Sequence, residues 1–273
     1  MKGISFGQYY PADSVIHRLD PRMKVVLTVF YIVCTFLCRS ALGFALLTLS
    51  AFSLILVSHI PVKTVLRSIR PILFFIAFTF VINIFWSKGE QLLWEFGVIH
   101  IYAEGIWNAV FMFLRIFSLI AGTGILLTYT TTPMDLTDAL ESLLSPLKKI
   151  RVPVHVFAMM MSITLRFIPT LMEETEKIMN AQKARGADFN SGNLIQRAKA
   201  LIPILIPLFV SAINRALELA NAMECRCYHG GEGRTRLTVM YCAKRDWVAF
   251  AGVLVFGVCL VLLNWANIGY VMK

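Results

Sequence analysis

The stretch Ile106–Tyr129, IWNAVFMFLRIFSLIAGTGILLTY, holds one charged residue, Arg115, in an otherwise apolar run. A helix of about 20 such residues, within a range of roughly 17–25, crosses the hydrocarbon core of a bilayer. Four further apolar runs, two of them short, lie along the chain. They are Met23–Cys38, Leu42–Ser58, Pro71–Trp86 and Trp247–Ala266. The sequence therefore predicts an all-α integral membrane protein with about five transmembrane helices.

The composition agrees with a membrane protein that carries a polar insert. Of the 273 residues, 58% are hydrophobic and 15% charged, and the mean hydropathy is +0.70. Soluble domains average about half apolar and about a quarter charged. The formal net charge of +10 would suit a nucleic-acid partner. Its clustering in particular connections indicates membrane topology instead, so no nucleic-acid partner is expected.

Basic residues are distributed unevenly between the connections. The connection between the second and third runs carries Lys63, Arg67 and Arg70 without an acid, whereas Ser87–Gly105 is acidic on balance. Basic loops stay in the cytoplasm. We therefore expect a multi-pass protein of the cell membrane with a cytoplasmic N-terminus. Its expected domains are a four-span membrane domain at 1–129, a cytoplasmic coupling domain at 130–246 and a final span at 247–273.

Residues 130–246 are expected to form three helices. The first begins at the N-cap Thr132 and runs to about Leu144, because Thr followed by Pro and an acid is typical of a helix start. The second covers Pro153–Arg185 with Gly186 as its C-cap, and the third covers Leu194–Tyr228. We expect Glu173, Glu174 and Glu176 to form a solvated face.

The long helices are only partly polar: Val154–Ile168 includes three consecutive methionines, and Leu201–Ile213 is almost wholly apolar. They could form an extra pair of spans. They could also lie along the membrane surface and present an apolar face to another subunit, which the two prolines of the second segment favour. Methionines suit such a face because their side chains repack against varied partners, although core packing is the more common role. The candidate residues of this docking face are Met159, Met160, Met161, Leu205 and Phe209.

Motifs for enzymatic chemistry are missing from the sequence. The glycine-rich segment Gly230–Thr235 lacks the lysine and the spacing of a phosphate loop. The spacing of Cys225, Cys227 and His229 fits no zinc pattern. We therefore expect neither an enzyme nor a cofactor. Any ATP that drives the protein would be bound by another chain.

Arg115 is the clearest charge within a predicted span. A charge there is a functional hypothesis by default. The structural alternative is that Arg115 pairs with a backbone carbonyl or with a polar group such as Asn83. An ion-coupled carrier would usually show acidic residues in mid-membrane, and the predicted spans contain none. A self-sufficient secondary transporter or channel is thus the weaker alternative.

Two arginine segments end the two long helices. The first is Ala184-Arg185-Gly186 and the second, looser copy is Ala222–Tyr228 with Arg226 at its centre. A cation at a helix C-terminus stabilises its own helix dipole. Two similar ends in one domain also match a partner with two similar receptor sites, where a guanidinium would meet carboxylates or carbonyls.

These segments resemble the T component of energy-coupling factor transporters, the membrane coupling subunit. The resemblance covers essentially the whole chain and rests on three features in order. They are the opening Tyr10–Ser14 with His17–Lys24, the Ala-Arg-Gly motif at 184–186, and the second motif with its following glycine-rich segment Gly230–Arg236. The second motif departs from Ala-Arg-Gly, since cysteines occupy positions 225 and 227.

The resemblance implies a coupling mechanism. Two cytoplasmic ABC-type ATPases would each receive one arginine motif, and a separate small membrane subunit, possibly one of several, would bind a vitamin or other micronutrient and pack on the apolar docking face. The residues expected to contact the ATPases are Ala184, Arg185, Gly186, Glu224, Cys225, Arg226 and Cys227. The substituted Cys227 would restrict the backbone if that position needs a positive φ.

Overall fold

The structure is a computed structural model that describes residues 9–86, 92–96, 99–187, 189, 193–230 and 240–265. The chain divides into two compact units. The first combines Met1–Ala139 with Val239–Lys273, and the second is Leu140–Thr238. The domain boundaries expected near residues 130 and 246 stay a prediction.

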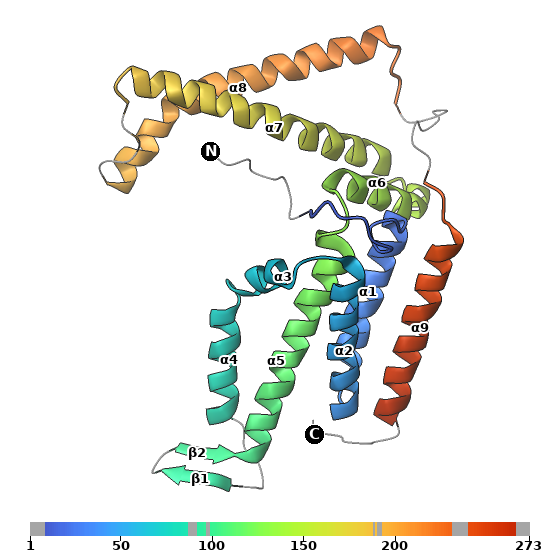
Figure 1. Cartoon of the computed structure of the whole chain (residues 1–273). Coiled ribbons are helices and arrows are strands. Elements are labelled where there is room, and N and C mark those ends of the chain that lie inside the picture. The colour runs from blue at the N-terminus through green and yellow to red at the C-terminus, as the bar shows by residue number, and fades with distance from the viewer. Residues whose placement is uncertain are drawn as a thin grey trace. The chain divides into compact units, whose positions relative to one another are not determined.

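The first unit is a bundle of apolar helices, in which α1, α2, α5 and α9 lie side by side and α4 packs on α5 (Figure 1). A short hairpin precedes α5, and a π-helical turn, Gly124–Thr128, continues that helix. The elements are α1 (Pro21–Leu37), α2 (Ala41–Ser58), α3 (Val62–Ile69), α4 (Leu73–Trp86), β1 (Leu92–Phe96), β2 (Ile99–Tyr102), α5 (Ala103–Thr123), α6 (Pro133–Leu143), which crosses the boundary between the units, and α9 (Lys244–Trp265).

The second unit consists chiefly of two long helices that cross each other, α7 (Val154–Ala184) and α8 (Leu194–Cys225) (Figure 1). A 3-10 turn, Ser145–Ile150, precedes α7. Proline lies inside both helices, once in α7 and twice in α8. The three-helix prediction is confirmed, and both long helices begin and end within three residues of their predicted limits. Asn193 caps α8 through a capping box with Gln196.

The all-α membrane class is confirmed, with each predicted span matched by a helix. By length and apolar composition, α2, α5 with its π turn, α7, α8 and α9 could each cross a membrane. The helix α1 has 17 residues, and α3 with α4 forms a pair bent by 60°. Because α7 and α8 meet the same criteria, their composition is compatible both with helices on the membrane surface and with an extra pair of spans. The hairpin β1–β2 in the acidic connection was not predicted.

Close helix packing in the first unit depends on glycines that face aromatic rings. Gly122 of α5 lies against the Tyr31 ring, and Gly257 of α9 lies against Phe30. A Cβ atom at either position would collide with the ring. Small residues let the backbones of membrane helices approach, which is how they gain packing contacts in lipid.

Arg115 has a structural partner. Its Nη2 atom donates a hydrogen bond to the carbonyl oxygen of Cys38 at 2.8 Å, near the C-terminal end of α1. The guanidinium also lies 5.2 Å from the centre of the Phe44 ring. A carbonyl at a helix end has no partner within its helix, so this contact supplies one to Cys38, and the ring face attracts the guanidinium. The expected pairing with a carbonyl is confirmed, whereas the side chain of Asn83 lies outside the described residues.

A buried polar junction joins the starts of α1 and α9. The ammonium of Lys24, only 1% exposed, donates to the carbonyl oxygens of His17 at 3.2 Å and Thr130 at 2.7 Å. The carboxylate of Asp246 accepts from the amide of Asp20 at 2.9 Å and from Ala243 at 2.6 Å. Two of these contacts join segments that are distant in sequence, and the others tie the residues just before α1 and α9 to these helices, so the junction fixes where the helices begin.

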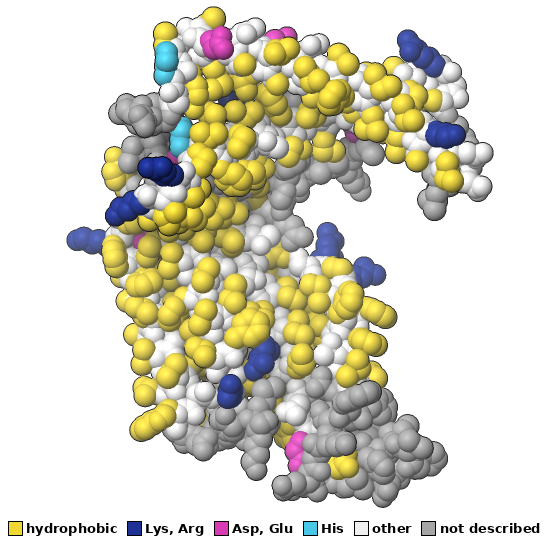
Figure 2. All heavy atoms as spheres, turned by 180° about the vertical axis from the view of Figure 1, so that it is seen from behind, with side chains coloured by type: hydrophobic (Ala, Val, Ile, Leu, Met, Phe, Trp, Pro, Cys, Tyr) yellow, Lys and Arg dark blue, Asp and Glu magenta, His cyan; other side chains and the backbone are white. Residues whose placement is uncertain are grey.

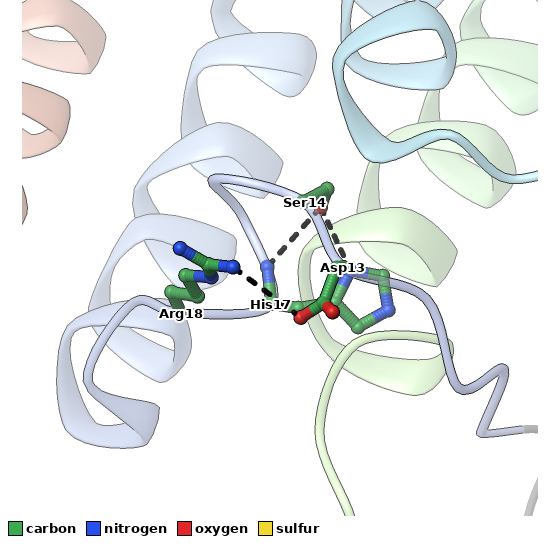
Figure 3. Close-up of polar contacts among 4 residues, drawn as sticks. All are labelled: Asp13, Ser14, His17 and Arg18. Atoms are coloured by element: carbon green, nitrogen blue, oxygen red, sulfur yellow. Dashed lines mark hydrogen bonds and ion pairs between the residues drawn. The ribbon is translucent and has the colours of Figure 1, made fainter.

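The opening motif forms a compact turn before α1 (Figure 3). The Ser14 hydroxyl lies 2.7 Å from Nδ1 of His17 and accepts from the His17 amide at 3.3 Å. Arg18 and Asp13 form an exposed ion pair at 3.6 Å. Exposed ion pairs contribute little to stability. The turn is therefore held by the serine–histidine contacts and leads the chain into the Lys24 junction.

Replacing Lys24 by Met should destabilise the protein, because the substitution removes two hydrogen bonds from a buried cation. We expect a loss of about 1.5–3 kcal/mol in the free energy of unfolding, measured as thermal or denaturant unfolding in detergent. Lys63→Met, at an exposed position of α3, should leave stability nearly unchanged. Equal stability of the two variants would contradict the role of the junction.

Candidate functional site: two arginine helix ends

The C-terminal end of α7 closes with two reverse hydrogen bonds. Gly186 donates to the carbonyl of Lys183 at 2.9 Å, and Ala187 donates to that of Gln182 at 3.0 Å. Gly186 has a φ of +87°. This combination is a Schellman turn, which satisfies helix-end carbonyls through a residue in the left-handed region. The turn places Arg185 at the last position of the helix.

The end of α8 repeats this geometry. Cys227 donates to the carbonyl of Glu224 at 2.8 Å, and Tyr228 donates to that of Met223 at 3.0 Å. Arg226 is the C-cap, as Arg185 is in α7. The two arginine segments, which differ in sequence, therefore form the same local structure.

Cys227 takes the left-handed position that Gly186 occupies in the first copy. Its φ is +55°, a conformation that costs a residue with a Cβ about 1–2 kcal/mol. The condition under which cysteine would restrict the backbone is thus met. The backbone turn nevertheless keeps the same hydrogen bonds, and both flanking thiols, of Cys225 and Cys227, are exposed.

Both guanidinium groups are available to a partner. Arg185 and Arg226 are exposed, and neither side chain has a hydrogen bond or ion pair to any residue that the structure describes. Ala184, Gly186 and Glu224 are exposed beside them. A fixed guanidinium with free donors suits carboxylates and carbonyls on a protein surface.

An open hollow of about 390 Å³ lies beside Arg226. Two residues of α7, Met159 and Ile163, form one side of it. The other side comes from the end of α8 and the residues after it: Leu219, Met223, Arg226, Cys227, Tyr228, His229 and Gly230. The end of α8 therefore packs near the start of α7, which means that the two helices run antiparallel.

Antiparallel packing sets the two arginines far apart. Ile163, near Arg226, precedes Arg185 by 22 residues of sequence, nearly all of them in α7. At 1.5 Å of rise per residue this separation is roughly 33 Å along the helix. The two ends consequently do not contribute to a single pocket.

Only part of the predicted docking face is exposed. Met160 is 52% exposed and Met161 39% exposed, as are Leu205 at 59% and Phe209 at 67%. Met159 instead is half-buried and lines the hollow beside Arg226. Hydrophobic side chains dominate the visible surface (Figure 2). Surface apolar area of this extent on helices is typical of an interface with protein or lipid.

One expectation for α7 is wrong. Glu174 is not on a solvated face, because its Oε2 atom lies 3.2 Å from Nη2 of Arg215 in α8. Glu173 and Glu176 are exposed as expected. No local sequence pattern indicates this pair, since its partners lie 41 residues apart on different helices.

Among the described residues no group of three potential metal ligands occurs.

Comparison with known proteins identifies relatives over nearly the full chain. The family model described as cobalt transport protein matches residues 12–237. The energy-coupling factor transporter transmembrane protein EcfT of Ruminiclostridium cellulolyticum is 52% identical over 97% of this chain and 96% of its own length. The proteins of the same name from Clostridium kluyveri and Bacillus subtilis are 49% and 44% identical over 97% of this chain and 97% and 99% of their own.

Exchanging Cys227 for Gly should stabilise the end of α8 by about 1 kcal/mol, because glycine adopts the left-handed region without strain. The amide of Tyr228 would then exchange with solvent roughly fivefold more slowly, as measured by hydrogen exchange. Cys225→Gly, two residues earlier in helical conformation, should instead weaken the last turn by about 0.5 kcal/mol. Equal effects of the two substitutions would contradict the assignment of the capping position.

Proposed function

The chain belongs to the family of energy-coupling factor transporter transmembrane proteins, and on that premise we propose that its second unit connects two cytoplasmic ABC-type ATPases to a separate substrate-binding membrane subunit. The chain is the transmembrane coupling component of such a transporter and not an enzyme in itself. Energy would come from ATP bound by the partner subunits.

One observation carries this proposal. Two helix ends of identical backbone geometry each expose an arginine without a described partner, and roughly 33 Å of helix separates them. A pair of like receptors, such as two copies of one kind of ATPase subunit, is the partner that such a pair of ends fits. In each receptor, acidic side chains or backbone carbonyls would accept the guanidinium donors.

Movement of the ATPases would then reach the membrane through rigid helices. When two ATPases approach or separate, the arginine ends move with them and change the orientation of α7 and α8. The exposed apolar residues Met160, Met161, Leu205 and Phe209 would hold the substrate-binding subunit, with Met159 contributing from the hollow. A small membrane subunit that binds a vitamin fits this apolar face.

The proposed location is the cell membrane, with the N-terminus and the arginine ends in the cytoplasm. The basic connection that contains α3 supports this orientation. The relatives do not favour a self-sufficient transporter. Arg115, the clearest charge within a predicted span, donates a hydrogen bond to the Cys38 carbonyl.

Reversing both arginine charges, as Arg185→Glu with Arg226→Glu, should abolish assembly with the ATPases. We would co-express each variant with candidate ATPases from the same source, extract the membranes in mild detergent and measure the ATPase that co-purifies. A matched reversal at the exposed Arg197 near the start of α8 should not reduce assembly. Normal assembly of the doubly reversed protein would contradict the docking role.

Cytoplasmic exposure of the second arginine end can be measured with its own cysteines. Cys225 and Cys227 are exposed, so a membrane-impermeant maleimide should label them in inside-out vesicles and not in intact spheroplasts. The labelled protein carries Cys242→Ser, is expressed without ATPases and is compared with a Cys225→Ser/Cys227→Ser control. Arg39→Cys, in the connection expected outside, should show the opposite pattern. Labelling of Cys225 and Cys227 in spheroplasts would overturn the orientation.

A further inference from the structure

The two crossing helices are joined by one salt bridge among their described residues. Nη2 of Arg215 in α8 donates to Oε2 of Glu174 in α7 at 3.2 Å. Both charged side chains are half-buried, with 37% of Arg215 and 24% of Glu174 exposed. The pair is therefore partly screened from water.

The position of this pair relative to the arginine ends is symmetric. Glu174 precedes Arg185 by 11 residues, and Arg215 precedes Arg226 by the same 11. Each interval is about 16 Å of helix and just over three complete turns. The ion pair thus lies midway between the two helix ends and near the same helical face as each of them.

A sequence repeat accompanies this symmetry. Asn180–Arg185 and Asn221–Arg226 both read Asn-Ala-x-x-x-Arg. Eight residues before each arginine lies a second charge, Lys177 in α7 and Glu218 in α8. The charges of the two helices have opposite signs at both matched positions. Each second charge lies three residues after Glu174 or Arg215 in its own helix and has the opposite sign, which is the spacing of a pair on one helical face.

We propose that Glu174 and Arg215 form a pivot that fixes the crossing of α7 and α8 and makes the two arginine ends move as one lever with equal arms. This inference rests on the proposed function. Apolar contacts around the crossing are non-directional and permit sliding and rotation. A charge-assisted hydrogen bond is directional, so it fixes the register of one helix on the other. Both residues are positioning residues, because they act through the arginine ends.

Charge reversal with rescue tests the pivot. Glu174→Arg and Arg215→Glu are made separately and together, with Glu173→Arg at the neighbouring exposed position as the matched control. The complex is assembled with the ATPases and a substrate-binding subunit. Three quantities are measured: the ATPase that co-purifies, ATP hydrolysis, and import of the one tritiated vitamin, from a panel, that the wild-type complex takes up.

Each single reversal should retain both ATPases but lower import per ATP hydrolysed by about fivefold or more. The double exchange, which restores the ion pair with opposite polarity, should return this ratio to within about twofold of wild type. Glu173→Arg should behave as wild type. A pair that served only folding would lower the amount of complex without changing import per ATP.

Other outcomes overturn the inference. They are single reversals that import normally per ATP, and a double exchange that accumulates without importing. A double exchange that fails to accumulate while Glu173→Arg does so also overturns it. If the single variants do not accumulate, the double exchange decides alone. Failure of the wild-type chain to bind ATPases would instead refute the proposed function, so the two failures are distinguishable.

Discussion

The closing turn of a helix is the constraint on which the two arginine helix ends depend. A helix leaves its last carbonyls without partners, and a residue in the left-handed region reverses the chain so that two following amides bond them. In both α7 and α8 this turn directly follows an arginine. The arginine is thereby held at the exposed end of its helix.

The first unit depends on other interactions. In lipid, apolar contacts alone do not determine which helices pack together. Glycines against Tyr31 and Phe30 allow close approach. The cations of the half-buried Arg115 and the buried Lys24 instead bond helix-end and loop carbonyls. Such contacts fix where helices begin and end.

The sequence predicted the helices well because their signals are local. Apolar runs marked the five helices α1, α2, α4, α5 and α9, and the cap at Thr132 marked α6, where its hydroxyl bonds Asp135. The arginine segments were also visible, through position and resemblance. Contacts between helices were not: Glu174 was expected in solvent, and its pairing with Arg215 depends on the antiparallel register of α7 and α8. The matching turns at the two helix ends could not be predicted either, because a cysteine at position 227 does not indicate a positive φ.

Photo-cross-linking from the two helix ends tests the central claim most directly. A benzophenone amino acid would replace Ala184 in one variant and Glu224 in another, both exposed beside the arginines, in the complex assembled with the ATPases. Each position should cross-link to an ATPase subunit, and the cross-linked sites should match between the two ATPase subunits. Cross-linking of only one end to an ATPase, or of both ends solely to lipid, would contradict it.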